Sequence, residues 1–248
     1  NLMLYPTELR AHGVRISVRA ARRHRLIAAV ALVLLAATPA AATCRATSGA
    51  TLGCDDGARL RLDGVLDDAA PAVLDAALAA GGWAVVPLGP PDRSGHVPVR
   101  VDLRGGASLQ AVLVGRGAAR VWPGVDGDLA RTLYAAEDLA REARRGRWAA
   151  DWGVLAAVPP PDATGGFAII RGEVLSSGET RRYGYLNFGR AYREDTTVRV
   201  RRDDARDWGW WGELERFVGG RVEARGALFE RGGPMLELDD PLQLRRLD

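Results

Sequence analysis

One stretch of the chain, AAVPPPDATGG over residues 156–166, limits the possible fold more than any other. It is rich in Ala, Pro and Gly, and it shows neither a helical period nor the alternation of a strand. Because proline lacks a backbone N–H and fixes one backbone angle, a helix or a central strand does not run through such a segment. The sequence therefore predicts a linker at residues 156–166, between one domain at 43–155 and a second at 167–248.

The first 42 residues carry a different signal. A basic flank precedes an apolar run from Leu26 to Ala37, and small residues follow at Ala40–Ala42. This order is typical of a secretory signal peptide, and the apolar run is shorter than the roughly 20 residues that span a bilayer. We expect residues 1–18 to be an over-extended gene start, and we expect cleavage after residue 42. The product would be a periplasmic or secreted protein without a transmembrane segment. A permanent membrane anchor is the alternative interpretation.

Removal of this segment changes the charge balance. The whole chain has 34 Lys and Arg against 31 Asp and Glu, whereas residues 43–248 have 28 against 30. A protein that binds polyanions normally has a clustered positive surplus, because neutralised phosphates supply much of its affinity. The charge balance is therefore unfavourable for nucleic acid as a partner, and it leaves a protein or a component of the cell envelope as the expected one.

Two cysteines, Cys44 and Cys54, lie close together in the expected mature chain. Disulfides persist in exported proteins. A Cys-metal site is the other interpretation, but it lacks ligands, since His96 is the only histidine downstream and no second Cys pair exists. We predict a disulfide that fixes the mature N-terminus to the first strand, and no metal or other cofactor.

The first domain reads as a small barrel of strands with helices packed on it. An Asp-Gly turn at Asp55–Gly57 joins two alternating runs, which predicts a hairpin. Ser108 is placed to cap the helix that follows it. The predicted strands lie at 50–54, 58–65, 83–88, 97–103 and 118–123, and the predicted helices at 70–80, 108–117 and 126–146.

The last of these helices has the clearest pattern. We expect Asp126 or Asp128 to cap its start and Gly146 to end it. Its apolar stripe is predicted to contain Leu129, Leu133, Ala136, Leu139 and Ala140. Glu137 and Arg141 stand four residues apart, as an ion pair on the solvent face does.

The second domain has five strand-like runs, at 166–177, 181–189, 196–202, 219–231 and 234–247, with a helical or irregular segment before the fourth. This order predicts an OB-like barrel, although an SH3-like barrel has a similar number of strands. The predicted fold class is thus mainly β with packed helices.

Aromatic and basic side chains alternate in the segment RRYGYLNFGRAYR. Arg182, Tyr183, Tyr185 and Tyr192 are the candidate ligand-binding residues, because stacking surfaces for single-stranded nucleic acid or glycans combine these types. The alternative is that the aromatic side chains fill the barrel, and it is favoured by the 15 Arg and 15 Asp and Glu of residues 165–248. Trp208, Trp210 and Trp211 similarly predict either core packing or a docking patch.

Two segments, DLRGGASLQAVLVGRGAARVWPG and YAAEDLAREARRGRWA, resemble the thermonuclease (staphylococcal-nuclease-like) family, and the resemblance covers roughly residues 48–150. The matching residues are Gly117, Ala119, Val121, Pro123, Glu137, Ala140, Gly146 and Trp148. The second domain more weakly resembles a C-terminal module of some exported thermonuclease-like proteins. The resemblance implies an N-terminal nuclease-type OB-fold barrel and calcium-dependent phosphodiester hydrolysis, in which carboxylates hold Ca²⁺, a Glu handles water and two Arg neutralise the phosphate.

The chain departs from that family at the residues that carry the chemistry. The positions of the two calcium-binding Asp are occupied by Ala50 and Leu66, and the position of the water-handling Glu by Ala69. Arg61 keeps the first arginine, and His96 stands at the second. Because Ca²⁺ takes six to eight oxygen ligands, we expect a degenerate member that is not an enzyme and acts as a binding module.

Two alternatives remain open. The first is an active periplasmic nuclease with rearranged residues, in which Asp67 and Asp68 hold Ca²⁺ and Arg61 and His96 bind the phosphate. In the absence of such a site, Asp67 and Asp68 are solvated carboxylates near a helix start, His96 is a turn residue, and Arg61 pairs with Asp63 or Asp92. The second alternative is an envelope scaffold protein without a role in nucleic-acid binding.

Overall fold

The alternating runs around Asp55–Gly57 form the predicted hairpin, and Gly57 adopts the positive φ of 85° that this turn requires. The computed structural model describes residues 43–124, 127–150, 152–161, 165–191 and 195–247, all within one compact unit. The predicted signal peptide and Tyr192 lie outside the described residues. No helix among those described is long and apolar enough to cross a membrane.

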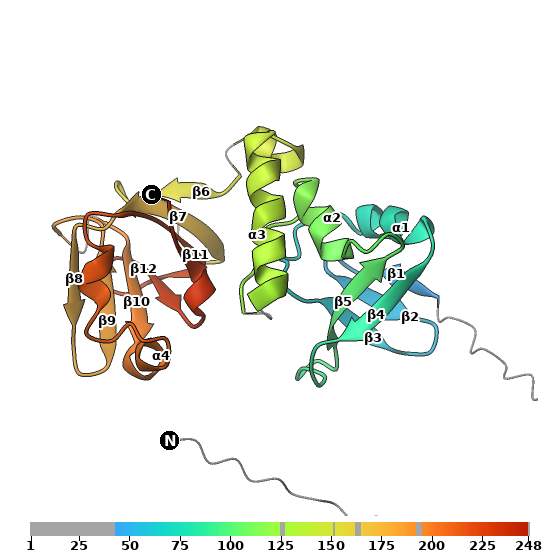
Figure 1. Ribbon diagram of the computed structural model, residues 1–248, viewed down its shortest axis with the longest axis horizontal. Coiled ribbons are helices and arrows are strands. Elements are labelled where there is room, and N and C mark those ends of the chain that lie inside the picture. The colour runs from blue at the N-terminus through green and yellow to red at the C-terminus, as the bar shows by residue number, and fades with distance from the viewer. Residues whose placement is uncertain (1–42, 125–126, 151, 162–164, 192–194, 248) are drawn as a thin grey trace, which may run out of the picture. The chain divides into compact units, whose positions relative to one another are not determined.

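The first sheet has five strands in the order β1-β2-β3-β5-β4, which Figure 1 shows in blue to green. Strands β3 and β5 are parallel, and the other neighbours are antiparallel. The strands are β1 (Cys44–Ala46), β2 (Thr51–Cys54), β3 (Arg59–Leu62), β4 (Trp83–Pro87) and β5 (Val97–Leu103). The expected strand at 118–123 is only an isolated bridge between Val65 and Val121. Cys44 and Cys54 are directly opposite each other and form the predicted disulfide.

Three helices accompany this sheet: α1 (Pro71–Ala79), α2 (Leu109–Gly115) and α3 (Gly127–Glu142), with a short 3₁₀ turn, η1, at Gly146–Ala149. The predicted cap of α2 is confirmed, because Ser108 Oγ accepts a hydrogen bond from the Ala111 N–H. Helix α3 differs from the prediction at both ends. Asp128 lies inside its first turn, Asp126 lies outside the described residues, and the helix ends at Glu142, before Gly146.

The predicted faces of α3 are partly wrong. Leu139 was expected in the apolar stripe but is 59% exposed, whereas Glu137 was expected on the solvent face but has no exposed surface. The predicted pair is nevertheless present, with 3.0 Å between Arg141 Nη2 and Glu137 Oε2. Glu137 is buried because α3 is covered on more than one side: the helix lies beside α2, and Glu137 also pairs with Arg225 of β11 in the second sheet.

The second sheet has the order β6-β7-β11-β12-β10-β9-β8, with β13 paired to β11. Strands β10 and β12 are parallel. The strands are β6 (Val154–Ala156), β7 (Phe167–Glu173), β8 (Ser176–Glu179), β9 (Tyr183–Asn187), β10 (Thr197–Arg201), β11 (Arg221–Glu230), β12 (Pro234–Leu238) and β13 (Leu244–Arg246). The connection from β10 to β11 contains α4 (Arg202–Asp207) and the 3₁₀ turn η2 (Leu214–Phe217), and η3 (Pro241–Gln243) precedes β13. The fold class is therefore mainly β, with two sheets and a few helices.

The tryptophans of the β10–β11 connection pack on the core of the second sheet. Trp210 is 8% exposed, and its ring meets Phe217 edge-to-face at 5.2 Å between centroids. Trp208 and Trp211 are partly buried against the same cluster. The interpretation as core packing is therefore confirmed for this segment.

Candidate functional site

The positions that the resemblance assigns to calcium chemistry are occupied by packed apolar side chains. Ala50 and Ala69 are 4% and 9% exposed and belong to the core of the first sheet. The two segments touch, because a Cβ atom on Gly49 would lie 2.1 Å from the Ala69 carbonyl oxygen and 2.7 Å from Asp67 Oδ1. Neither alanine nor Leu66 offers an oxygen ligand from its side chain, so the residues present do not fit a calcium ion.

Asp68, one of the two candidates for a rearranged calcium ligand, is paired with Arg120. Its Oδ2 accepts hydrogen bonds from the backbone N–H and from Nε of Arg120, at 3.1 and 2.9 Å, and its Oδ1 accepts one from Nη2 at 2.8 Å. The Arg120 guanidinium lies 5.0 Å from the ring centroids of Trp152 and Phe167. Asp67 is exposed to solvent. Asp68 is thus one half of a structural ion pair.

Arg61 and His96 are brought together by a third residue, Asp92. The distance from Arg61 Nε to Asp92 Oδ2 is 3.6 Å, and that from His96 Nδ1 to Asp92 Oδ1 is 3.8 Å. Asp63 lies on the other side of Arg61, with 3.5 Å between Nη1 and Oδ1. The expected pairing of Arg61 with an aspartate is therefore confirmed, and both candidate aspartates take part.

Asp92 organises the turn that contains His96. Its Oδ1 accepts hydrogen bonds from the backbone N–H groups of Ser94 and His96, at 2.8 and 3.0 Å. The bond from the His96 N–H is the main reason why the pKa of Asp92 is lowered. Burial raises the pKa of Asp63 on the other side of Arg61. His96 is thus a turn residue, and Asp92 links it to Arg61.

The aromatic residues of β9 lie on the outer face of the second sheet. Gly184 and Leu186 lie on the face that packs on the core of the second sheet, whereas Tyr183 and Tyr185 alternate with them and are half-buried, with 6.2 Å between their ring centroids. The interpretation that the aromatic side chains fill the barrel is wrong for these two residues and right for Phe188, which is 3% exposed.

Arg199 supports this outer face from β10. It stands opposite Tyr185 in the β9 ladder and opposite Glu237 in the β12 ladder. Its Nε donates to Glu237 Oε2 at 2.8 Å, and its guanidinium lies 4.6 Å from the ring centroid of Tyr183. Arg199 is only 7% exposed, and Glu237 balances its charge within the protein. Arg182, by contrast, is exposed just before β9.

A hollow of about 710 Å³ lies beside β8 and β9. We call it the β8–β9 hollow. Its lining consists mostly of hydrogen-bonding groups around one aromatic ring: Ser176, Glu179, Thr180, Tyr185, Asn187, Arg190 and Asp195, together with Leu175, Gly178 and Gly189. Of these residues, only Tyr185 is among the candidate ligand-binding residues predicted from the sequence. The alternation of β9 offers a signal for one more, since Asn187 is two residues after Tyr185 and shares its face.

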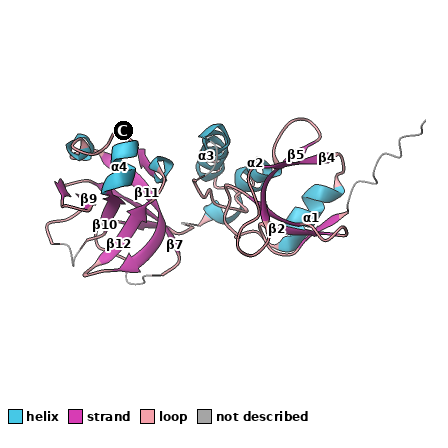
Figure 2. Ribbon diagram, turned by 90° about the horizontal axis from the view of Figure 1, so that it is seen from below, coloured by secondary structure: helices cyan, strands magenta, loops and turns pink. Residues whose placement is uncertain are grey.

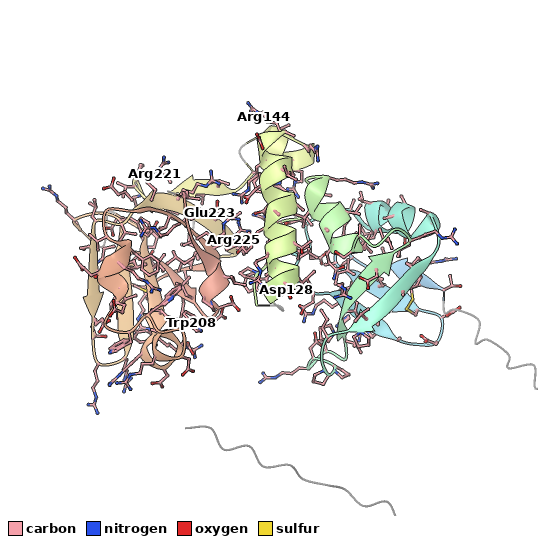
Figure 3. The ribbon with its side chains drawn as sticks, in the orientation of Figure 1. Asp128, Arg144, Trp208, Arg221, Glu223 and Arg225 are labelled. Atoms are coloured by element: carbon pink, nitrogen blue, oxygen red, sulfur yellow. A yellow bond between two sulfur atoms is a disulfide. The ribbon has the colours of Figure 1, made fainter. Side chains whose placement is uncertain are left out.

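A buried ionic cluster extends the predicted pair of Glu137 and Arg141 by Glu223, Arg225 and, at its edge, Arg171, which no local sequence pattern indicated. Glu223 and Arg225 lie on the part of β11 that faces α3, as Figure 3 shows. Glu137, Glu223 and Arg225 are each at most 1% exposed.

The charges of this cluster are mutually compensated. Burial alone would raise the pKa of Glu223, but the guanidinium groups of Arg225 and Arg141 lower it to about 2. Burial is also the largest cause of the raised pKa of Tyr134, about 12, whose hydroxyl donates to the Leu242 carbonyl at 2.6 Å. The cluster thus stabilises the packing of α3 against β11 and is closed to solvent.

Within the described residues, no group of three or more His, Cys, Asp or Glu side chains is arranged to hold a metal ion. The comparisons with known proteins add no assignment: no protein-family model and no curated protein matches this chain.

Proposed function

We propose that this chain is an exported, thermonuclease-like binding protein without phosphodiesterase activity, and that it binds a glycan of the cell envelope in the β8–β9 hollow. The observation that carries the proposal is the set of side chains that line the hollow. It combines one half-buried tyrosine ring with hydroxyl, amide, carboxylate and guanidinium groups. A concave site of this size with a few convergent polar groups is the usual form of a small-ligand site.

The side chains at the positions of the family's carboxylates support the non-catalytic part of the proposal. Ala50, Leu66 and Ala69 stand where the family places its carboxylates, and Asp68 is held by Arg120. The disulfide supports export, because disulfides form and persist outside the reducing cytoplasm.

The strand order supports the further proposal that the second sheet is an OB-like barrel. Only Val174 and Leu175 separate β7 from β8, yet these strands lie near opposite ends of the sheet. Strands β10 and β12 are parallel, and α4 precedes β11. OB-folds bind oligosaccharides or oligonucleotides on the face of their second and third strands, which correspond here to β9 and β10.

The charges of the hollow favour a glycan over a nucleic acid. Glu179 contributes one exposed carboxylate and Arg190 one guanidinium, so the hollow has no positive surplus that would attract a phosphodiester. Sugar hydroxyls can both donate to carboxylates and accept from arginine or amide N–H groups. The face of Tyr185 offers apolar area with a polar edge, which suits a ring that has hydroxyls at its rim.

Several of these polar groups are already oriented by the protein. The Glu179 Oε1 accepts the Gly212 N–H at 2.7 Å, and Asn187 Nδ2 donates to Ser176 Oγ at 3.2 Å. Oriented groups lose less conformational entropy on binding than mobile ones do.

The test is calorimetric titration of the protein, purified after export, with tetrasaccharides of N-acetylglucosamine and of glucose and with single-stranded decathymidylate. We expect saturable binding of one of the glycans, weakened about tenfold or more by Tyr185→Ala, which corresponds to about 1.4 kcal/mol. Tyr183→Ala is the matched control, because it removes the same side chain from the same face of β9 outside the lining of the hollow. Equal losses in both variants, or no glycan binding, would refute the proposal.

Two further outcomes identify the alternatives. Binding of decathymidylate that weakens steeply with salt would assign the face to nucleic acid instead. Cleavage of DNA that depends on millimolar Ca²⁺ and is abolished by Asp67→Ala would show an active site with rearranged residues. We expect neither cleavage nor heat of calcium binding.

A further inference from the structure

The first sheet leaves two strands without a neighbour on one side. Its order begins with β1 and ends with β4, and no ladder among the described residues joins these two strands. Figure 2 shows the strands of this sheet as an open arc. A groove of about 1050 Å³, here called the β1–β4 groove, is lined by β1, β4 and α1 together.

The backbone of β4 presents hydrogen-bonding groups on its open edge. The Leu88 N–H donates to the Pro98 carbonyl, and the ladder with β5 continues in steps of two residues. By this alternation, Ala84 and Val86 bond to β5, whereas the N–H and C=O groups of Trp83 and Val85 point the other way. No hydrogen bond from the described residues reaches these groups of Trp83 and Val85.

The opposite wall of the groove is formed by β1 and α1, where a disulfide and a side-chain hydrogen bond hold β1 in place. The disulfide from Cys44 to Cys54 ties β1 to β2. On α1, Asp75 Oδ1 accepts the Ala46 N–H of β1 at 2.8 Å. The Ala46 N–H is therefore already bonded within the protein, and the proposal concerns the edge of β4.

The side chains of the groove define what can lie in it. Leu60, Leu78 and Val85 form an apolar floor with Trp83 beside them. The charged groups among its lining residues are Asp56, Asp75 and Arg45, two carboxylates against one guanidinium. An occupant with apolar side chains and a basic residue complements this set.

We infer that the β1–β4 groove binds an extended segment of a partner protein, which adds to the edge of β4 as a further strand. N–H and C=O groups spaced two residues apart match an extended backbone, because a helix satisfies its own backbone groups internally. Alternate apolar side chains of the segment face Leu60 and Leu78, and a Lys or Arg approaches Asp56 and Asp75. The opposite side chains of the segment face solvent and can be polar.

This site differs from the β8–β9 hollow in sheet, chemistry and ligand, and it does not rest on the glycan proposal. It gives the chain a second binding surface, suited to a protein partner in the cell envelope. An open strand edge left uncovered is also a site of unwanted association, which is why such edges are usually covered or charged.

The test uses an array of hexapeptides with blocked ends, which alternate Val, Ile, Leu or Phe with Thr or Ser and begin or end with Lys. We expect a subset to bind the protein purified after export and to slow amide hydrogen exchange at Trp83 and Val85 by about tenfold or more. The same peptides with N-methyl groups on alternate residues keep their side chains but lose backbone donors, and they should not slow exchange.

Two variants distinguish peptide binding at the edge of β4 from non-specific binding of the peptides elsewhere on the protein. Val85→Lys places a charge in the groove and should abolish the slowed exchange, whereas Ala84→Lys adds the same charge at an exposed neighbour on the other face and should not. Circular dichroism of both variants checks that they fold. Failure of the whole array, equal effects of N-methylated peptides, or equal loss in both variants would overturn the inference. A peptide-independent dimer that protects the same amides would assign the edge to a second copy of the chain instead.

Discussion

Arg225 of β11 donates from Nη2 to Oε2 of Glu137 on α3 at 2.8 Å, and the two side chains are 1% and 0% exposed. Arg225 Nη1 also donates to the Val121 carbonyl at 3.1 Å, and Glu137 Oε1 accepts the Val121 N–H at 3.0 Å. Glu137 and Val121 are two of the residues that carry the thermonuclease resemblance. In this chain both residues bind an arginine from the second sheet, so these two positions of the motif take part in packing α3 against β11.

This relationship predicts that Arg225→Met is strongly destabilising. Loss of the guanidinium leaves the Glu137 carboxylate buried without its main partner, and breaking a buried pair in this way costs about 3–5 kcal/mol. Urea unfolding should show this decrease, whereas Arg231→Met, at an exposed turn, should change stability by less than about 0.5 kcal/mol. If the double variant Arg225→Met with Glu137→Leu is no more stable than Arg225→Met alone, the unpaired carboxylate is not the cause.

The lowered pKa of Glu223 predicts acid sensitivity. The folded protein holds the pKa of this carboxyl at about 2, against 4.5 for an unpaired glutamate. The unfolded chain therefore binds a proton at a higher pH than the folded chain does, so the stabilisation is fully present above pH 4.5 and is lost as pH falls towards 2. Unfolding by urea at a series of pH values measures this slope. Glu223→Gln should flatten it, and an unchanged slope in that variant would contradict the assignment.

The two adjacent aspartates should respond differently to the same substitution. Asp68→Asn removes the charge that faces the partly buried Arg120 and should cost about 2–3 kcal/mol. Asp67→Asn, at an exposed position, should change stability by less than about 0.5 kcal/mol. Thermal or urea unfolding of the two variants gives the comparison. Equal effects would mean that the pair with Arg120 does not form in solution.

A close backbone contact predicts that Gly117 cannot be replaced. Gly117 has a φ of 66°, and a Cβ there would lie 2.1 Å from the Arg145 carbonyl oxygen. Gly117→Ala should cost about 3 kcal/mol or more, because the clash adds to the strain of a positive φ. Gly95 has a similar φ of 77° but no atom within 4 Å of such a Cβ, so Gly95→Ala isolates the strain, about 1–2 kcal/mol. A Gly117→Ala variant no less stable than Gly95→Ala would refute the contact.

The sequence by itself determined the features that depend on neighbouring residues. The turn at Gly57 and the cap at Ser108 follow from local backbone geometry, and the disulfide between Cys44 and Cys54 follows from two nearby cysteines in a chain expected to be exported; each is present. The pairing of Glu137 with Arg141 also follows from helical spacing. Such features can be predicted from a short segment of sequence, because the interacting groups lie close together along the chain.

Only the tertiary structure decided which side chains became buried and what they bind. Helical period located α3, but it gave the wrong faces to Glu137 and Leu139. A second packing surface, on β11, buries Glu137 against Arg225. The partners of Asp68 and Glu137 lie 52 and 88 residues away in sequence. A carboxylate that is costly to bury alone becomes stable when the fold brings a guanidinium to it, and no local pattern contains that information.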